Sequence, residues 1–352
     1  MRSWLLSVVT TLTVCVGQAV AEPTEGPIAP PPSSPVATHG ALRVCGLQLC
    51  DRAGQPIQLR GMSTHGIQWY AGCASGPALD VLASDWQANL LRISMYVQED
   101  GYETDPERFT DLVDTLIARA TSRGLYVIVD WHILTPGDPA KNLDRAKTFF
   151  AEIASRYQGA DNVLYEIANE PSGVSWSEIR SYAEQIIPVI RAEDPDSVVL
   201  VGTRGWSSLG VSDGADEQEV VDDPVRADNV MYTFHFYAAS HGDEYFDALS
   251  RAADKLPMFV TEFGTQKYTG DGSNDFDRAA SYVDLMDAKG IGWANWNWSD
   301  DERSGAVFKR GTCESMDYAN TDRLKPAGVW VRDRLRTPPV FAGSAPSGKP
   351  VA

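Results

Sequence analysis

Basic residues are scarce in this sequence, and this limits the partners that the protein can have. The chain holds 30 Lys and Arg against 48 Asp and Glu, which gives a formal net charge of −18 at pH 7. Like charges repel at long range, so this balance argues against a nucleic acid or an anionic membrane surface as a partner. A neutral substrate is compatible with it.

Metal-binding and nucleotide-binding patterns are also missing. No CxxC pair occurs, and the histidines are scattered along the chain. The segment GMSTHG is not the glycine-rich loop that a nucleotide-binding sheet carries after its first strand. We therefore expect no metal and no other cofactor, with a zinc site as the alternative interpretation of the cysteines.

Long apolar runs are absent except at the start of the chain. Residues Trp4 to about Val16 are apolar, follow Arg2 and precede the small residues Ala19-Val20-Ala21. This pattern predicts that residues 1–21 are a secretory signal peptide. No later segment approaches the ~20 apolar residues of a membrane helix. We therefore expect a secreted, extracellular protein that does not bind membranes.

Two Pro-rich segments flank the remaining chain. Residues 22–39, EPTEGPIAPPPSSPVATH, have almost no large apolar side chains, and the end of the chain, residues 338–352, is similar. Such segments cannot bury enough surface to order themselves, so we expect a linker or disordered arm and a disordered tail. Residues 40–337 contain no internal break in composition and are predicted to form one domain.

The pattern of this domain predicts an α/β barrel. Residues 41–61 alternate apolar and polar side chains around a turn at Gly46, which is typical of a β-hairpin. Apolar or β-rich runs follow at 57–65, 88–96, 124–132, 162–170, 197–203, 229–237, 257–264 and 290–299. Helical segments separate most of them, at 105–124, 142–157, 176–192, 243–255 and 275–289, whereas 207–223 is acidic and loop-like. Eight such units predict a (β/α)8 TIM barrel with an N-terminal β-hairpin, with an open doubly wound sheet as the alternative.

Without Cys15 of the predicted signal, four cysteines remain, an even number in an oxidising compartment. Disulfides are then the default, with three possible connectivities. Cys45 and Cys50 flank the turn of the hairpin. Cys73 follows the first barrel strand and Cys313 the eighth, and these strands are neighbours if the barrel closes. We therefore predict the pairs Cys45 to Cys50 and Cys73 to Cys313.

Two of the predicted strands end in a carboxylic acid. The run NVLYEIANE is apolar until Asn169 and Glu170, and Pro171 stops it; the run PMFVTEFG likewise leads into Glu262. A lone glutamate at a strand end is usually only a solvated edge residue. Two such strands, 92 residues apart (262 − 170), indicate one site built from distant parts of the chain.

The ends of the other strands are also polar or aromatic, and in a (β/α)8 barrel they share one face. They include His65, Arg92, Tyr96, His132, His235, Tyr237 and Trp296. Taken singly, Arg92 could be a buried ion-pair partner, the histidines could be core residues and Trp296 could be packing. Together they surround two carboxyl groups, the pair that glycoside hydrolysis requires.

The motifs GMSTHGIQWY, LRISMYV, VDWH, IANEP, FHFY, TEFG and WANWNWSDD occur in this order at the strand ends. With them the chain resembles glycoside hydrolase family 5, and its GMSTHGIQWY segment resembles the bacterial endoglucanases of that family. The resemblance covers about residues 43–336. It implies that Glu170 is the acid/base and Glu262 the nucleophile, supported by Arg92, His132, Asn169, His235, Tyr237 and Trp296.

The same resemblance implies where the sugar binds. His65, Trp69, Tyr70 and Tyr96 are similar to residues on the glycone side of the cut, and Trp206 could stack a sugar on the leaving-group side. The chain departs from the family after the eighth strand, where Asp301, Glu302 and Arg303 replace a Lys and an acidic residue of the relatives.

Residues 40–337 are thus expected to be the catalytic domain of a secreted, monomeric, retaining endo-β-1,4-glucanase that acts on a β-glucan such as cellulose. A mannanase or another β-glycanase of the family is the nearest alternative. A non-catalytic sugar-binding barrel is the alternative from another class, and a metal-dependent hydrolase on the same fold is a third.

Overall fold

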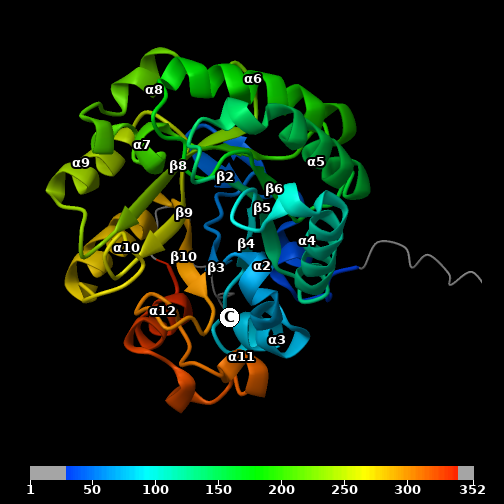
Figure 1. Ribbon diagram of the computed structural model, residues 1–352, viewed down its shortest axis with the longest axis vertical. Coiled ribbons are helices and arrows are strands. Elements are labelled where there is room, and N and C mark those ends of the chain that lie inside the picture. Colours follow the sequence, from blue (N-terminus) through cyan, green and yellow to red (C-terminus); the bar gives the residue numbers. More distant parts are fainter. Residues whose placement is uncertain (1–28, 340–352) are drawn as a thin grey trace, which may run out of the picture.

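The structure is a computed structural model that describes residues 29–339, in which eight parallel strands close into a barrel surrounded by helices (Figure 1). The strand order is β10-β3-β4-β5-β6-β7-β8-β9, so the first and last barrel strands are neighbours. The strands are β3 (Arg60–Thr64), β4 (Leu90–Tyr96), β5 (Tyr126–His132), β6 (Val163–Glu166), β7 (Val199–Val201), β8 (Val230–Tyr237), β9 (Met258–Gly264) and β10 (Gly292–Trp298). The predicted TIM barrel is confirmed.

Long helices form the outer ring in Figure 1. They are α3 (Gly76–Ser84), α4 (Pro106–Thr121), α5 (Leu143–Arg156), α6 (Trp176–Glu193), α9 (Asp243–Ala252), α10 (Phe276–Lys289) and α12 (Pro326–Arg336). Helix α4 begins as expected, because Asp105 accepts a hydrogen bond from the backbone of Arg108 and Pro106 opens the first turn. Helix α6 begins with a capping box between Ser175 and Glu178.

Short elements fill the loops. They are the helices α1 (Pro35–His39), α2 (Ile67–Tyr70), α7 (Arg204–Ser207), α8 (Gln218–Asp222) and α11 (Thr312–Ser315), and the 3-10 turns η1 (Ala71–Ala74), η2 (Tyr102–Thr104), η3 (Pro139–Asn142), η4 (Val211–Asp213) and η5 (Thr321–Arg323). Among the described residues, no helix is both long and apolar enough to cross a bilayer.

The prediction differs from the structure at several boundaries. Helices α3 and α12 were not predicted, although both carry a proline in the first turn. The β6 strand ends at Glu166, four residues before the predicted end at Glu170, because the chain leaves the sheet there to form the loop that carries Glu170. The predicted signal peptide and nearly all of the predicted tail lie outside the described residues.

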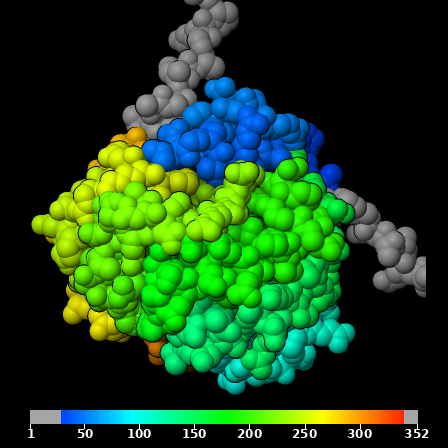
Figure 2. Space-filling view, turned by 90° about the horizontal axis from the view of Figure 1, so that it is seen from above, coloured from blue at the N-terminus to red at the C-terminus, as the bar shows by residue number. Residues whose placement is uncertain are grey.

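The N-terminal hairpin covers the amino end of the barrel. Strands β1 (Arg43–Cys45) and β2 (Gln48–Cys50) pair antiparallel around Gly46, whose positive φ of 66° suits glycine. This confirms the predicted hairpin. Residues up to 39 were expected to be a disordered arm, but Pro35–His39 forms α1 and buries Val36, so that expectation is wrong for these residues. Figure 2 shows the N-terminal segment (blue) packed against the body of the domain.

The hairpin and the amino ends of the strands share one apolar core, which we call the amino-end cluster. Its members include Leu42, Leu49, Ile57, Leu59, Leu90, Tyr126, Ile128, Leu164, Leu200, Met231, Phe259 and Ala294. Side chains two residues apart on a strand face the same side. Arg92 and Glu166 therefore follow Leu90 and Leu164 on the same faces of β4 and β6, toward the carboxyl end of the barrel. Thr261 lies where the register of β9 shifts, and its hydroxyl bonds Glu166.

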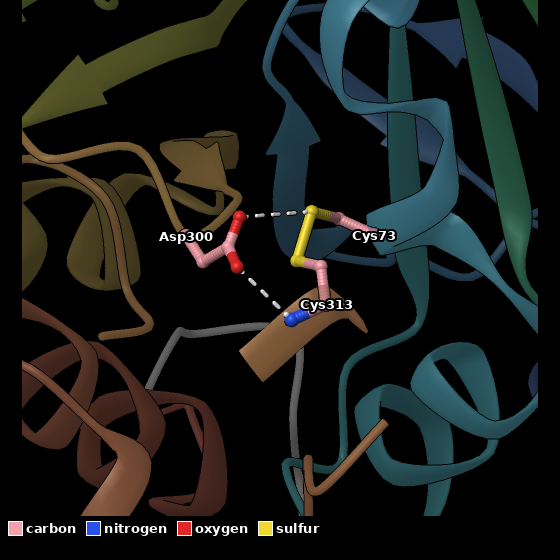
Figure 3. A group of neighbouring side chains, drawn as sticks. All are labelled: Cys73, Asp300 and Cys313. Atoms are coloured by element: carbon pink, nitrogen blue, oxygen red, sulfur yellow. Dashed lines mark hydrogen bonds between the residues drawn. A yellow bond between two sulfur atoms is a disulfide. The ribbon is translucent and has the colours of Figure 1, made fainter. Parts of the chain in front are cut away.

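Both predicted disulfides are confirmed, since Cys45 is joined to Cys50 and Cys73 to Cys313. The second connects the loops that follow β3 and β10. Figure 3 shows Asp300 beside it: Oδ2 accepts a hydrogen bond from the Cys313 backbone N–H at 3.1 Å, and Oδ1 lies 3.7 Å from Cys73 Sγ. As half of a disulfide, this sulfur has neither a proton to donate nor a thiolate to offer a metal.

Candidate active site

A cavity of about 1200 Å³ opens at the carboxyl end of the barrel. All the predicted catalytic and sugar-binding residues lie at this end, and all but Arg92 and Asn169 line the cavity. Those two are completely buried behind it. The barrel thus brings together side chains from all eight of its strands or the loops that follow them, from His65 after β3 to Trp296 on β10.

The two predicted catalytic glutamates face each other in this cavity. One oxygen of Glu170, one oxygen of Glu262 and one ring nitrogen of His235 all lie within 4.8 Å of one another. The side chain of Glu170 is 13% exposed and that of Glu262 is 5% exposed. Carboxyl groups that activate water for direct displacement at a sugar carbon stand roughly 6.5–9.5 Å apart, so this pair is too close for that geometry.

Glu262 is held from two sides. Arg92 Nη1 donates to its Oε2 at 3.2 Å, and the Tyr237 hydroxyl donates to its Oε1 at 2.5 Å. Both donors favour the ionised carboxylate and fix its orientation. Burial, together with the charges of Glu262 and Glu170, raises the pKa of Tyr237 well above its usual value, so the phenol keeps the proton that it donates.

Arg92 also binds two carboxyl groups that were not predicted as site residues, Glu166 and Asp130. Its Nε donates to Glu166 Oε2 at 2.6 Å, and its Nη2 lies 2.9 Å from Asp130 Oδ2. Burial alone would raise the pKa of Glu166, but Arg92 and the His235 ring, whose Nε2 lies 3.8 Å from Oε1, lower it to about 2. Burial raises the pKa of Asp130 despite the opposing effect of Arg92. Of these two carboxyl groups, Glu166 is therefore the one that more strongly favours the ionised form and balances the charge of Arg92.

His132 and Asn169 form a neutral pair beside Arg92. Burial, and then the charge of Arg92, lower the pKa of His132 to about 3, so the ring is neutral. Its Nδ1 lies 2.6 Å from Asp130 Oδ2 and Asn169 Nδ2 lies 3.3 Å from its Nε2, which indicates a proton on Nδ1. Asn169 Oδ1 accepts from Arg92 Nη2 at 2.7 Å and Nδ2 also donates to the Ile133 carbonyl at 3.3 Å. Both the oxygen and the nitrogen of the amide thus have partners within the protein.

His235 links Glu170 to the buried groups. Its Nδ1 lies 3.0 Å from Glu170 Oε1, and its Nε2 lies 2.9 Å from the Thr261 hydroxyl. Burial alone would lower the pKa of His235, but the carboxylate of Glu166, 3.8 Å from Nε2, and the hydrogen bond to Glu170 raise it to about 9. The ring is therefore a cation at neutral pH.

An aromatic wall lies on the side of β3 and β10. The Trp69 and Tyr96 rings are 5.2 Å apart, and the His65 ring lies 5.2 Å from that of Trp296 and 4.8 Å from that of Tyr70. Flat apolar faces with polar edges suit sugar rings. Burial lowers the pKa of His65 to about 4, so this wall is neutral.

The three residues that depart from the family pattern divide between the cavity and the surface. Asp301 and Arg303 line the cavity, and Asp301 Oδ2 lies 3.7 Å from His65 Nε2. Glu302 does not line it and pairs with Arg310 in solvent. Two of the three positions can therefore contact a ligand.

Trp206 stands on the opposite side of the cavity, with 46% of its surface exposed. Its backbone is left-handed, with φ 57°, and its N–H donates to the Pro171 carbonyl at 3.0 Å. That bond ties Trp206 to the loop that carries Glu170. Sequence patterns did not identify the other lining residues that follow β7, β8 and β9, which are Ser208, Ser212, Ala239, Ser240, His241, Glu244, Tyr245, Lys267, Tyr268, Thr269 and Gly270.

The missed residues behind the cavity did leave a signal in the sequence. Glu166 and Asp130 are charged residues within apolar runs, VLYE and VIVD, and both are completely buried. A charge inside a buried strand requires a partner. The lining residues of the loops leave no comparable pattern.

Comparisons with known proteins agree with the geometry. A family model described as cellulase (glycosyl hydrolase family 5) matches residues 50–302. The chain is 62% identical over 308 residues to endoglucanase E-5 of Thermobifida fusca, covering 88% of this chain and 66% of that protein. It is 55% identical over 306 residues to endoglucanase MaCel5A of Microbulbifer sp., covering 86% of this chain and 59% of that protein. The chain thus spans less than two thirds of the length of these relatives.

The crystal structure of the catalytic domain of the Thermobifida fusca endoglucanase is also similar. It superimposes with a TM-score of 0.86 at 62% identity, covering 86% of this chain and 100% of that one. A variant of that catalytic domain was crystallised with cellotetraose and matches with the same TM-score, 0.86.

Proposed function

The chain belongs to the cellulases of glycosyl hydrolase family 5, and from this premise we propose that it is an endoglucanase that cuts internal β-1,4-glucosidic bonds of cellulose or a soluble β-glucan with retention of configuration. The observation that carries the proposal is the approach of Glu170 and Glu262 to within 4.8 Å, with Arg92 and Tyr237 bonded to Glu262 and not to Glu170.

In the first step Glu262 attacks the anomeric carbon while Glu170 gives a proton to the leaving oxygen. A carbon–oxygen bond to Glu262 forms as the glycosidic bond breaks, which leaves a glycosyl ester. Arg92 and Tyr237 keep Glu262 ionised and pointed at the cavity before this attack. The spacing leaves no place for a water to attack directly, so the nucleophile is the carboxylate itself.

In the second step a water molecule cleaves the ester. Glu170 has lost its proton and now accepts one from the attacking water. Inversion at each of the two steps restores the original configuration. Glu170 thus acts as the acid in the first step and as the base in the second.

The cavity supplies contacts for the glucan on both sides of the glutamates. Trp69, Tyr70, Tyr96, His65 and Trp296 would bind the glycone part, and Trp206 a sugar of the leaving group. Asn169 is completely buried, accepts a hydrogen bond from Arg92 and lies beside His132. We assign it to positioning Arg92 and the loop before Glu170. Sugars are neutral, which is consistent with the acidic surface of the protein.

We further propose that the enzyme is secreted and acts as a monomer without a cofactor. The signal-like start of the sequence supports export, and the two disulfides suit an oxidising compartment.

Side-by-side initial rates test the substrate. We expect the highest rate on carboxymethylcellulose or barley β-glucan, and lower rates on xyloglucan and mannan, with chelator present throughout. A preference for mannan would favour a mannanase on the same site. Sugar binding without release of reducing ends would favour a non-catalytic barrel, and loss of activity to the chelator a metal-dependent hydrolase.

A further inference from the structure

Glu166 is completely buried at the end of β6 and does not line the cavity. Its Oε2 accepts a hydrogen bond from Arg92 at 2.6 Å, which balances charge. Its other oxygen, Oε1, accepts a hydrogen bond from the Thr261 hydroxyl at 2.7 Å. This second contact leads away from Arg92 and toward Glu170.

The direction of the hydrogen bonds along this path follows from the number of protons. The Thr261 hydroxyl has one proton, which it uses in the hydrogen bond that it donates to the Glu166 carboxylate. Its oxygen must therefore accept a hydrogen bond from the next group. That group is His235 Nε2 at 2.9 Å, which must therefore carry a proton. His235 Nδ1 then faces Glu170 Oε1 at 3.0 Å, and one proton fits between these two atoms.

We propose that Glu166 is a positioning residue for the acid/base: through Thr261 it fixes a proton on His235 Nε2, so that His235 Nδ1 and Glu170 share the single proton that catalysis uses. The inference rests on the proposed function, in which Glu170 is the acid/base.

The two steps balance with one shared proton. As Glu262 bonds to the anomeric carbon, the proton leaves Glu170 for the glycosidic oxygen and His235 Nδ1 is left without one. When water cleaves the ester, its proton returns to Glu170 and is again shared with Nδ1. Thr261 and His235 Nε2 keep their protons throughout, and Glu166 stays an ionised carboxylate.

The surroundings of His235 favour keeping this proton. The titratable groups around it are Glu166 on β6 and Glu170 after it, Glu262 on β9, Asp130 and His132 on β5, Arg92 on β4 behind Glu166, and Tyr237 and His241 on and after β8. Burial lowers the pKa of His235, but the carboxylate of Glu166, 3.8 Å from Nε2, the hydrogen bond to Glu170 and the charge of Glu262 raise it to about 9. The pair therefore holds its proton up to about that pH.

The sharpest variant is Thr261→Val, because it removes the hydroxyl and leaves the ion pair of Glu166 with Arg92 intact. Glu166→Gln is less specific, since it also removes a negative charge that balances the buried Arg92. Thr261→Ser keeps the hydroxyl and should behave like the wild type. Thr110→Val is the matched control, because Thr110 is also buried, its hydroxyl bonds the Pro106 carbonyl in α4, and it does not line the cavity.

The readout is the pH dependence of kcat/KM, which reports groups of the free enzyme. On β-glucan, Thr261→Val should move the basic limb to lower pH by about one to two units, the size expected for a lost hydrogen bond to a charged group. Thr261→Ser and Thr110→Val should not move it. On 2,4-dinitrophenyl β-cellobioside, whose leaving group needs no proton, formation of the glycosyl ester should change little.

Nitrogen NMR of ¹⁵N-histidine gives a readout that does not depend on activity, with the His235 signals identified by their loss in His235→Gln. The wild type should show both ring nitrogens of His235 protonated at pH 7, and Thr261→Val should titrate at lower pH. An unmoved basic limb together with an unmoved NMR titration would overturn the inference, as would an equal loss of rate at every pH on both substrates. A wild type without activity on any β-glucan would instead overturn the proposed function, and the NMR titration would still decide the protonation of His235.

Discussion

The two ends of the barrel are built on the same strands but hold different kinds of side chain. At the amino end, Leu90, Leu164 and Phe259 meet in the apolar amino-end cluster beneath the hairpin. Two residues further along the same strands, Arg92, Glu166 and Thr261 form a buried polar network. One end is held together by apolar packing and the other by charge and hydrogen bonds.

This difference separates stability from chemistry. Burying apolar side chains stabilises the fold by about 25 cal/mol per Å². Burying an arginine with three carboxyl groups adds little net stability, because desolvation offsets much of the attraction. The carboxyl end therefore has another use, which is to fix the proton states and orientations of Glu170 and Glu262.

The largest expected effect comes from comparing two substitutions on β9, one at each end of the barrel. Glu262→Gln should lower turnover by several orders of magnitude and leave the fold intact, because only the nucleophile is lost. Phe259→Ala should cost about 3–5 kcal/mol of unfolding free energy and leave kcat of the folded enzyme nearly unchanged. Urea unfolding and assays at low temperature measure both. Loss of activity in folded Phe259→Ala would contradict the separation.

Buried arginines at the two ends give the next comparison. Arg92→Met leaves Glu166 and Glu262 buried without their cation, and should cost about 3–5 kcal/mol and abolish activity. Arg60 donates to the carbonyls of Leu335 at 3.0 Å and Thr337 at 2.7 Å, at the end of α12. Arg60→Met should cost about 1–3 kcal/mol and spare activity. Equal losses of activity in the two folded variants would break the comparison.

The disulfides also lie at opposite ends. Cys73 and Cys313 are 240 residues apart and join the loops that carry Tyr70 and Asp301. Replacing both with serine should cost up to about 5 kcal/mol and raise KM. Cys45 and Cys50 are 5 residues apart, and replacing both should cost about 2 kcal/mol with KM unchanged. Chemical denaturation and KM on a cello-oligosaccharide distinguish the two, and a raised KM in the hairpin variant would be the contrary result.

Exposed apolar side chains give the smallest effect. Trp206 beside the cavity is 46% exposed, and Leu47 in the hairpin turn is 42% exposed. Trp206→Ala should lower kcat/KM on a cello-oligosaccharide roughly two- to tenfold, through a lost stacking contact of about 0.5–1.5 kcal/mol. Leu47→Ala is the control and should change nothing measurable. If Trp206→Ala matched it, Trp206 would have no part in binding.

The amino-acid pattern predicts the barrel better than it predicts the network behind the cavity. Strand periodicity and helix signals such as Asp105-Pro106 are local, so they can be recognised without the fold. The rim residues were found because they end strands. Glu166 and Thr261 lie inside the predicted runs 162–170 and 257–264, and which neighbour each one meets is decided by the register of the closed barrel. Trp206 was found, but its left-handed backbone was not, because no local pattern at that position requires it.

The product formed first by the wild-type enzyme is the most direct test of the central claim, that Glu262 attacks as a nucleophile while Glu170 manages the proton. Proton NMR during hydrolysis of a cello-oligosaccharide follows the anomers before they interconvert. A retaining enzyme must release the β-anomer first, with the α-anomer appearing only by mutarotation. Release of the α-anomer first would mean direct attack by water, and the assignment of Glu262 as the nucleophile would be wrong.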